Sequence, residues 1–168
     1  PRDEIPQYLC DQTFASFGIG NHQEIRCYLN SRAAHYLWNN KQERITRFLD
    51  EQVQEDKLAH VKIDVIKEPQ YVRTQDIDLL LDTDSLPTTR MHLINPFDNI
   101  IRERALLAKY WHFQYTLEAY TPPAKRKYGY YLMPILDGHH FIGRLEPKVH
   151  RKEQILEIKS IFFEAEYT

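Results

Sequence analysis

Three consecutive cations, Lys125, Arg126 and Lys127, follow two prolines and precede a cluster of tyrosines within the segment 121–131. Lysine binds phosphate as a point charge and arginine as a planar fork, while the prolines stiffen the turn and reduce the entropy lost on binding. The tyrosine rings can stack on bases or enter an opened base step. The segment therefore predicts a hairpin loop that contacts nucleic acid through Lys125, Arg126, Lys127 and Tyr128. The alternative is a solvated turn beside core tyrosines.

A second set of cations follows in the next predicted strand and turn, where it can share a face with the first. Its members are Arg144, Lys148, Arg151 and Lys152. Residues 122–152 contain seven lysines and arginines against two acidic residues, whereas residues 1–100 contain 11 against 16. The overall charge of −2 thus conceals an acidic N-terminal part and a basic patch. Only the patch suits a polyanionic partner.

Residues that suggest catalysis are few. Carboxylate pairs such as Asp76 and Asp78 are spaced i, i+2 in or near loops, which favours solvated charge over an acid/base couple. The eight histidines lack zinc-site spacing, and Cys10 and Cys27 form no Cys-x-x-Cys motif, so we expect no metal. Neither a P-loop nor a Rossmann glycine motif occurs, and no apolar stretch is long enough for a transmembrane helix. The sequence favours binding over local catalysis.

Helical periodicity dominates the N-terminal part. Apolar residues recur at helical spacing in three segments, and the third follows a capping-box pattern at Asn40 and Glu43. The period then changes to two, which is typical of strands. The expected helices are 5–17, 21–28 and 40–53, and the expected strands are 61–66 and 71–73. Three helices followed by a β-ribbon predict a winged helix, which usually places its third helix in the major groove.

The third predicted helix leaves two interpretations open. Its cations, Lys41, Arg44 and Arg47, have the charge for direct DNA contact. The same helix continues into Asp50 and Glu51, which a phosphate-facing surface would normally avoid. The acidic residues favour a structural or protein-contact role for this helix.

The C-terminal part follows a connector over residues 82–95 and a helix over 96–110. Alternating aromatic and aliphatic residues then predict antiparallel strands, and Asp137-Gly138 is a two-residue hairpin signal. The expected strands are 113–121, 128–136, 140–146 and 154–164. The predicted fold class is α+β, a winged helix followed by a small antiparallel β-sheet or barrel. The predicted domains are 1–81 (winged helix), 82–112 (connector and helix) and 113–168 (β).

The resemblance of the chain to a known family depends on three runs of residues. These are Asn95-Pro96-Phe97-Asp98-Asn99, the run from Leu117 to Leu136 that contains Ala124-Lys125-Arg126-Lys127-Tyr128-Gly129-Tyr130-Tyr131, and Gly143-Arg144-Leu145-x-Pro147-Lys148. They resemble the C-terminal part of the YcaQ-type, or AlkZ-like, crosslink-repair DNA glycosylases. The match is dense over residues 93–152 and weaker over 14–74. The resemblance implies tandem winged helices followed by a β-barrel.

This resemblance implies hydrolysis of the N-glycosidic bond of bulky N7-alkylated purines, including those in interstrand crosslinks, without metal or cofactor. The family supplies catalytic help from a Gln-apolar-Asp or Gln-apolar-Gln motif near its N-terminus. That motif should lie upstream of Pro1, so we expect a C-terminal fragment that is inactive alone. Gln52-Val53-Gln54 has the right letters but ends a predicted recognition helix, and no catalytic residue is transferred. The family's basic hairpin, which resembles 122–131, is placed to probe the duplex near the lesion.

The expected partner is double-stranded DNA that contains alkylated or crosslinked purines. We expect a monomer in the cytoplasm, associated with the nucleoid when it acts on DNA, with no membrane partner. The alternative is a winged-helix interaction module that binds protein or RNA and has no enzymatic activity.

Overall fold

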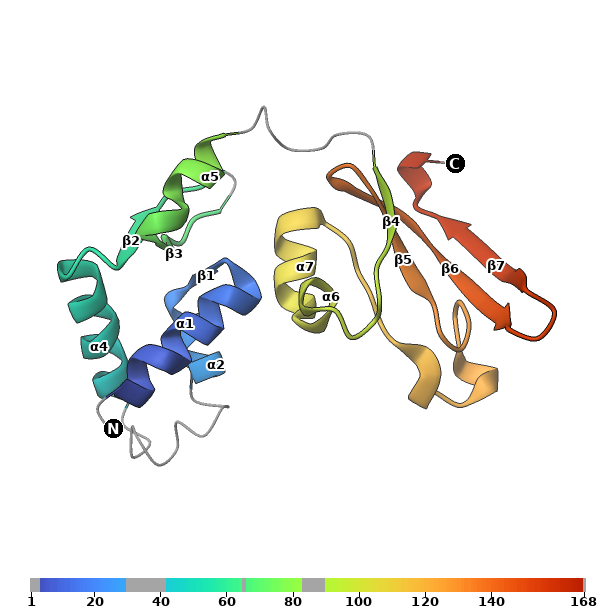
Figure 1. The fold of residues 1–168 in the computed structure, drawn as a ribbon, viewed down its shortest axis with the longest axis horizontal. Coiled ribbons are helices and arrows are strands. Elements are labelled where there is room, and N and C mark those ends of the chain that lie inside the picture. The colour runs from blue at the N-terminus through green and yellow to red at the C-terminus, as the bar shows by residue number, and fades with distance from the viewer. Residues whose placement is uncertain (1–3, 30–41, 65, 83–89, 168) are drawn as a thin grey trace. The chain divides into compact units, whose positions relative to one another are not determined.

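The computed structural model describes residues 4–29, 42–64, 66–82 and 90–167. These residues form six α-helices and two antiparallel sheets, and the chain separates into two compact units, Pro1–Ser85 and Leu86–Thr168 (Figure 1). The predicted combination of helices and antiparallel strands is confirmed, whereas the described strands form open sheets and not a closed barrel. The domain boundaries expected at 81/82 and 112/113 stay predictions.

The N-terminal unit packs helices against a three-stranded sheet of order β1-β3-β2. Its elements are α1 (Ile5–Phe17), β1 (Ile19–Asn21), α2 (His22–Leu29), α4 (Gln42–Gln54), β2 (Leu58–Val61), β3 (Gln70–Arg73) and α5 (Ile77–Leu81). The core joins Phe14 of α1, Ile25 of α2, Leu49 of α4 and Tyr71 of β3. Gly18 ends α1 with a φ of +70°, and its N–H donates to the carbonyl of Phe14, as the helix prediction over 5–17 requires.

The expected strand over 61–66 is wrong in its bounds. Strand β2 begins at Leu58 and ends at Val61, where its pairing with Gln70 is the last of the ladder. The N–H of Ile66 donates to the carbonyl of Ile63, and the strand pairing does not continue past Val61. Strand β1 has only three residues, too few to show alternation in the sequence, and it was recognisable only through its pairing with β3.

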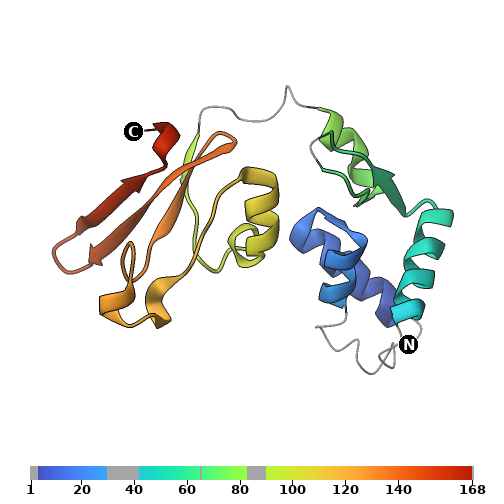
Figure 2. The same cartoon turned by 180° about the vertical axis from the view of Figure 1, so that it is seen from behind.

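The C-terminal unit is built on a four-stranded antiparallel sheet of order β4-β5-β6-β7, whose strands lie side by side in Figure 2. Its elements are β4 (Met91–Leu93), α6 (Asn99–Arg102), α7 (Arg104–Trp111), β5 (Met133–Asp137), β6 (His140–His150) and β7 (Ile155–Phe163). Ile101 and Leu107 of the two helices share a core with Phe113, Tyr115 and Phe141. The hairpin expected at Asp137-Gly138 is confirmed, because Asp137 pairs with His140 and Gly138 has a φ of +55°.

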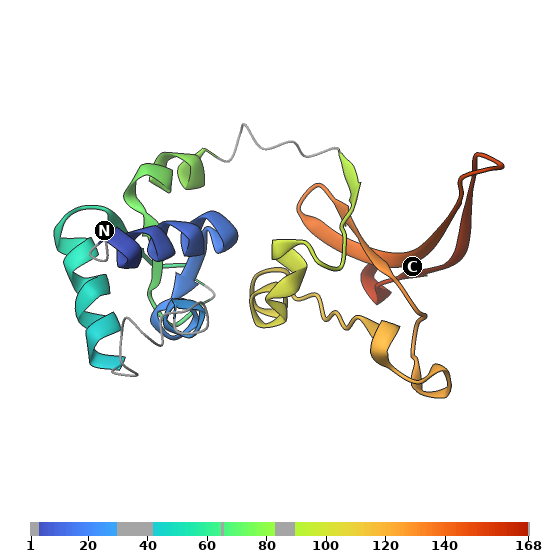
Figure 3. The ribbon, with the colours of Figure 1, turned by 60° about the horizontal axis from the view of Figure 1, so that its bottom comes forward.

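The expected strand over 113–121 is not a strand. Its alternation is real, since Phe113 and Tyr115 are buried while Gln114 and Thr116 are exposed. Burial of every second residue shows only that the backbone is extended. This segment pairs with no described strand before it enters the 3-10 turn η4 (Glu118–Tyr120). Figure 3 shows the segment between α7 and β5 extending away from the strands.

Four further boundaries in this unit differ from the sequence prediction, and one of them is the end of β6, which continues to His150 and not only to residue 146. The connector expected over 82–95 contains β4, whose three residues are all exposed and give no alternation. The helix expected over 96–110 is two helices separated at Glu103, although Asp98 caps the first by accepting the N–H of Ile100 at 3.0 Å. The strand expected over 128–136 begins only at Met133.

The two cysteines differ in accessibility. Cys10 is buried in the core of the N-terminal unit, and this burial, reinforced by the Asp11 charge, raises the pKa of its thiol to about 12. Cys27 is exposed on α2, and both thiols are free. No helix of the described ranges has the length and apolar character needed to cross a membrane.

Gly143 of β6 tests the close packing of the β6–β7 pair. A Cβ atom here would overlap the carbonyl oxygen of Phe162 and lie 3.1 Å from the Cα of Phe163. We expect Gly143→Ala to lower the free energy of unfolding by about 1–3 kcal/mol, measured by urea unfolding followed by circular dichroism. Gly20→Ala is the control, because its Cβ would approach nothing closer than 3.4 Å. Equal unfolding midpoints for the two variants would contradict the overlap.

Candidate nucleic-acid interface

One carboxylate holds the loop that carries the three consecutive cations. Glu118 is only 7% exposed, and its Oε1 accepts the N–H of Lys127 at 2.8 Å. Its Oε2 accepts the N–H groups of Tyr128 at 2.8 Å and of Gly129 at 3.0 Å. Hydrogen bonds to an ionised acceptor are stronger than neutral ones. The loop 118–131 is therefore closed by the Glu118 carboxylate in place of a strand ladder.

The same contacts determine the ionisation of Glu118. Burial by itself would raise the pKa of this carboxyl group, but the three backbone N–H donors and the nearby Arg126 charge favour the ionised form. The net effect lowers its pKa below the ordinary value of 4.5. Glu118 is thus a carboxylate wherever the loop is intact at neutral pH.

Local hydrogen bonds shape the tip of the loop into a 3-10 turn, η5 (Pro123–Lys125). The N–H of Lys125 donates to the carbonyl of Pro122 at 2.9 Å, and the N–H of Arg126 donates to that of Pro123 at 3.2 Å. The Arg126 Nε also donates to the carbonyl of Thr121 at 2.9 Å. The tip is a compact prolyl turn, which fixes the backbone beneath the cations.

Aromatic rings hold two of the three tip cations. The guanidinium carbon of Arg126 lies 5.0 Å from the ring centroid of Tyr130, and the Nζ of Lys127 lies 4.7 Å from that of Tyr128. Cation–π contacts of this length restrain the side chains without neutralising their charge. Lys125 and Lys127 are exposed, so their ammonium groups are available to a partner.

Gly129 meets a steric requirement of the loop. A Cβ atom at this position would overlap Oε2 of Glu146, the atom that accepts the N–H of Tyr130 at 3.2 Å. The other carboxylate oxygen of Glu146 lies 3.7 Å from the Nζ of Lys159 on β7. Gly129 therefore lets Glu146 connect the loop to the sheet.

Arg144 lies at the centre of the site and not at its surface. It is 4% exposed, and its guanidinium forms an ion pair with Glu164. The guanidinium carbon also lies 4.4 Å from the ring centroid of Tyr128 and 4.6 Å from that of Phe113. The Arg144 Nε has no hydrogen-bond partner among the described residues. Arg144 joins the loop, the helical core and the segment after β7.

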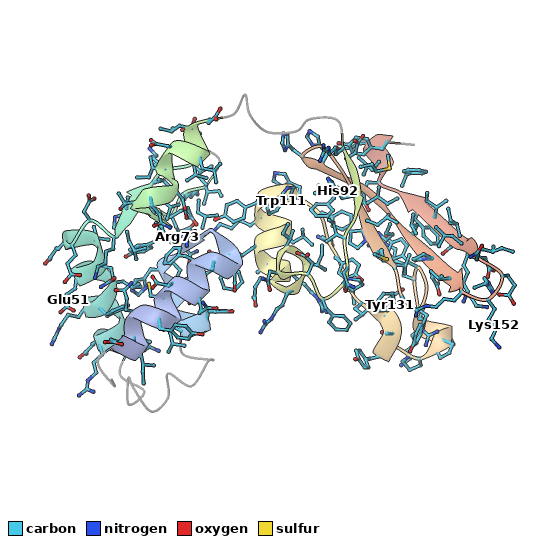
Figure 4. The ribbon with its side chains drawn as sticks, in the orientation of Figure 1. Glu51, Arg73, His92, Trp111, Tyr131 and Lys152 are labelled. Carbon is cyan, nitrogen blue, oxygen red and sulfur yellow. The ribbon has the colours of Figure 1, made fainter. Side chains whose placement is uncertain are left out.

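The remaining predicted cations lie along and beyond β6. Lys148 is exposed, with its Nζ 3.9 Å from Oε2 of Glu157 on β7, and His150 makes a 2.7 Å contact with the same oxygen. The contact with His150, followed by the Lys148 charge, lowers the pKa of the Glu157 carboxyl group. Arg151 and Lys152 are exposed in the β6–β7 turn, where Figure 4 labels Lys152 at the end of the hairpin. Lys148 is thus partly compensated, whereas Arg151 and Lys152 have no ion pair among the described residues.

A cavity of about 670 Å³ brings three of the predicted residues together. Lys127, Tyr128 and Arg144 line it with three residues that sequence reasoning missed, namely Arg104, His112 and Gln114. The exposed positions of the alternating stretch 112–116 were a usable signal for the last two. His112 has a left-handed backbone with a φ of +52°, which is uncommon outside glycine and turns the chain from α7 into that stretch. Arg104 carried no sequence signal, because only the fold brings the start of α7 to the loop.

One of the cations predicted on the third helix, Arg47, lies in a mixed-charge groove. Lys41 lies outside the described residues. Arg44 and Arg47 are exposed on α4, and Arg47 lines a groove of about 430 Å³ together with Glu43 and Asp50. Such a mixture suits a polyanion less well than the C-terminal loop does.

The Gln52-Val53-Gln54 run lies on a helix, which separates its two glutamines. Gln52 is buried, with its Oε1 unpartnered among the described residues, while Gln54 is exposed. Residues i and i+2 share a face in a strand but not in a helix. The two amides therefore do not converge on one point.

A comparison with models of protein families shows which family this chain belongs to. The model for the DNA glycosylase AlkZ-like family matches residues 1–167. The chain belongs to the AlkZ-like DNA glycosylase family. Membership confirms the resemblance. It also assigns the chain to DNA-repair hydrolases that bind DNA and act on it. The search of solved structures found no match.

In the described ranges, no three metal-ligating side chains lie close enough together to hold an ion.

The loop anchor of this family member can be tested with Glu118→Gln. Removing the charge weakens hydrogen bonds that, as bonds to a charged group, contribute about 1.5–3 kcal/mol each. We expect the amide protons of Lys127, Tyr128 and Gly129 to exchange at least about thirtyfold faster, corresponding to about 2 kcal/mol. Amide hydrogen exchange followed by NMR measures this. Glu153→Gln in the exposed β6–β7 turn is the control, and equal exchange in both variants would contradict the anchor.

Acidification offers a second test of the same carboxylate. Because its pKa is lowered in the folded loop, ionised Glu118 stabilises the loop above pH 4.5, its ordinary pKa. That stabilisation is lost as the pH falls through the lowered pKa. In an NMR titration, the amide shifts of Lys127, Tyr128 and Gly129 should move together at a pH below 4.5. Shifts that stay constant, or that move independently of one another, would be inconsistent with a shared acceptor.

Proposed function

We propose that this chain is the DNA-binding C-terminal part of a glycosylase that excises bulky N7-alkylated purines and unhooks interstrand crosslinks. The observation that carries the proposal is the Glu118-anchored loop with its exposed cations. The resemblance to the crosslink-repair glycosylases over residues 93–152 supports the choice of lesion. The contacts we propose in this part are Lys125, Arg126, Lys127 and Tyr128, with Lys148, Arg151 and Lys152 as further phosphate contacts. Arg144, which was predicted as a contact, is buried, and we propose that it supports DNA binding through its charge.

The loop can bind a duplex with little reorganisation. Its backbone is fixed by Glu118 and by the prolyl turn, so few rotatable bonds have to be ordered on binding. The exposed ammonium groups of Lys125 and Lys127 suit strand phosphates. Tyr128 and Tyr130 lie next to the cations and offer rings where a base step opens around a bulky adduct.

In this proposal the excision step depends on residues upstream of this chain. An N7-alkylated purine carries a positive charge and leaves readily, so a polar group that positions water and stabilises an oxocarbenium-like state is sufficient. The Gln-apolar-Asp or Gln-apolar-Gln motif implied by the resemblance fits that role. The separation of Gln52 from Gln54 on α4 supports a location for the motif outside the present chain.

For the N-terminal unit we propose a winged helix. The order of α1, α2 and α4 before the antiparallel β2–β3 pair supports this. Arg44 and Arg47, with Lys41, are its proposed DNA contacts. The Glu43 and Asp50 carboxylates beside Arg47 favour the second candidate function, an interaction module that contacts protein or RNA. We also propose that the protein acts as a monomer in the cytoplasm, where it associates with the nucleoid that contains its DNA substrate.

The triple variant K125A/R126A/K127A tests the loop as a phosphate contact. Removing three cations should weaken duplex binding and reduce the slope of log K against log salt by up to about three units. Fluorescence anisotropy with a labelled duplex across a salt series measures both. The charge-matched control is K62A/K67A/R102A, which removes three exposed cations that we do not place in the interface. Equal slopes for the two triple variants would exclude the loop from phosphate binding.

Base release separates binding from catalysis. Incubated with a duplex that contains N7-methylguanine, this chain should bind the DNA and release no free base above the rate of spontaneous depurination. Chromatography of the released base measures the outcome, with the complete parent protein as the positive control. Release by this chain alone would place an active site within it and overturn the division of roles.

A further inference from the structure

The cavity lined by α7, the extended stretch 112–116 and the loop has a net positive charge, because three cations (Arg104, Lys127 and Arg144) line it with two carboxylates (Glu118 and Glu164). Its two carboxylates are already engaged: Glu118 accepts three backbone N–H groups, and Glu164 forms an ion pair with Arg144. Arg104 and Lys127 also line the cavity, and neither has a carboxylate partner among the described residues. Both side chains are exposed and accessible to a ligand.

Arg144 adds an unsatisfied donor to the wall of this cavity. It is buried to 4% exposure, yet its Nε has no hydrogen-bond partner among the described residues. A buried donor without an acceptor is destabilising, and an anion bound nearby would interact favourably with the guanidinium charge. The rings of Phe113 and Tyr128 pack against the guanidinium, whose carbon lies 4.6 Å and 4.4 Å from their respective centroids.

The size and lining of the cavity define the class of ligand. At about 670 Å³ it has the volume of a small-molecule site and exceeds what a bare inorganic anion fills. The exposed Gln114 and Thr116 provide hydrogen-bonding groups at the same wall. The guanidinium of Arg104 and the ammonium group of Lys127, which line the same cavity, suit phosphate oxygens, and the remaining volume suits the sugar and base attached to them.

We propose that this cavity binds a phosphate ester of a nucleic-acid strand, with Arg104 and Lys127 holding the phosphate and Gln114 contacting the attached nucleoside. The inference rests on the proposed DNA-binding function and extends it to a second phosphate site. Lys127 belongs to both the loop tip and the cavity, so a strand that contacts the tip can continue into the cavity without leaving the protein surface. The ester is either an internal phosphodiester of that strand or a phosphate at a strand terminus.

Arg104→Ala tests the cavity, with Arg102→Ala as the matched control. Both arginines are exposed and lie two positions apart, but only Arg104 lines the cavity. We expect Arg104→Ala to weaken binding and to reduce the salt slope by about one unit, while Arg102→Ala leaves both unchanged. Gln114→Ala should weaken binding without changing the slope. Circular dichroism melting curves verify that each variant is folded.

Two DNA probes distinguish the sources of the phosphate. One is a blunt duplex without terminal phosphates, and the other is the same duplex with a short single-stranded overhang that ends in a 5′ phosphate. An effect of Arg104→Ala on both probes identifies an internal phosphodiester, and an effect confined to the second identifies a terminal phosphate. The proposal is overturned if Arg104→Ala and Arg102→Ala have the same affinity and the same salt slope on both probes. It is also overturned if an acidic peptide occupies the cavity and DNA binding is unaffected.

The outcomes for the loop and the cavity are distinguishable. If the cavity inference fails, Arg104→Ala has no effect while K125A/R126A/K127A still lowers the salt slope. If the loop tip fails as a phosphate contact while the cavity binds one, the triple variant loses only about the one unit due to Lys127 and not up to three, and Arg104→Ala still loses about one unit.

Discussion

The Glu118 carboxylate is the constraint on which the C-terminal site depends. The segment between α7 and β5 has no described strand partner, so its backbone donors need another acceptor, and Glu118 accepts three of them in succession. The position of Glu118 is fixed in turn by the alternation before it, which buries Phe113 and Tyr115. The Tyr115 hydroxyl donates to the carbonyl of Leu132 at 2.7 Å, which fixes the far end of the segment. An anionic residue thus organises a cationic surface.

Arg144 extends this organisation to the sheet. A buried ion pair contributes little net stability, because the cost of removing both charges from water offsets their attraction. The role of Arg144 is better understood as structural: it is a buried charged group that lies between two aromatic rings. Its guanidinium keeps Tyr128 and Phe113 at a set separation, and Glu164 limits the net charge of the interior. The other two cations that line the cavity, Arg104 and Lys127, are exposed.

Local sequence patterns predicted α1, α2, α4 and the β5–β6 hairpin, but they missed α5, joined α6 to α7 and did not give the boundaries that tertiary pairing decides. The helix ending at Gly18 and the turn at Gly138 both depend on a left-handed glycine, which is a local property. The stretch 113–121 shows the limit, because alternating burial arises equally in a strand and in an unpaired extended segment. The cations of the site were evident from their spacing. Arg104 was not, because its role depends on a contact between segments far apart in the chain.

The two cysteines differ in a way that has a practical consequence. A thiol reacts as its thiolate, and the buried Cys10, with a pKa of about 12, forms almost none of it at neutral pH. Cys27 is exposed on α2 and is the only other cysteine in the sequence. A maleimide reagent will therefore couple to the native protein at a single position without any cysteine being engineered or removed. That position gives the N-terminal unit a built-in attachment point for a fluorophore or a spin label.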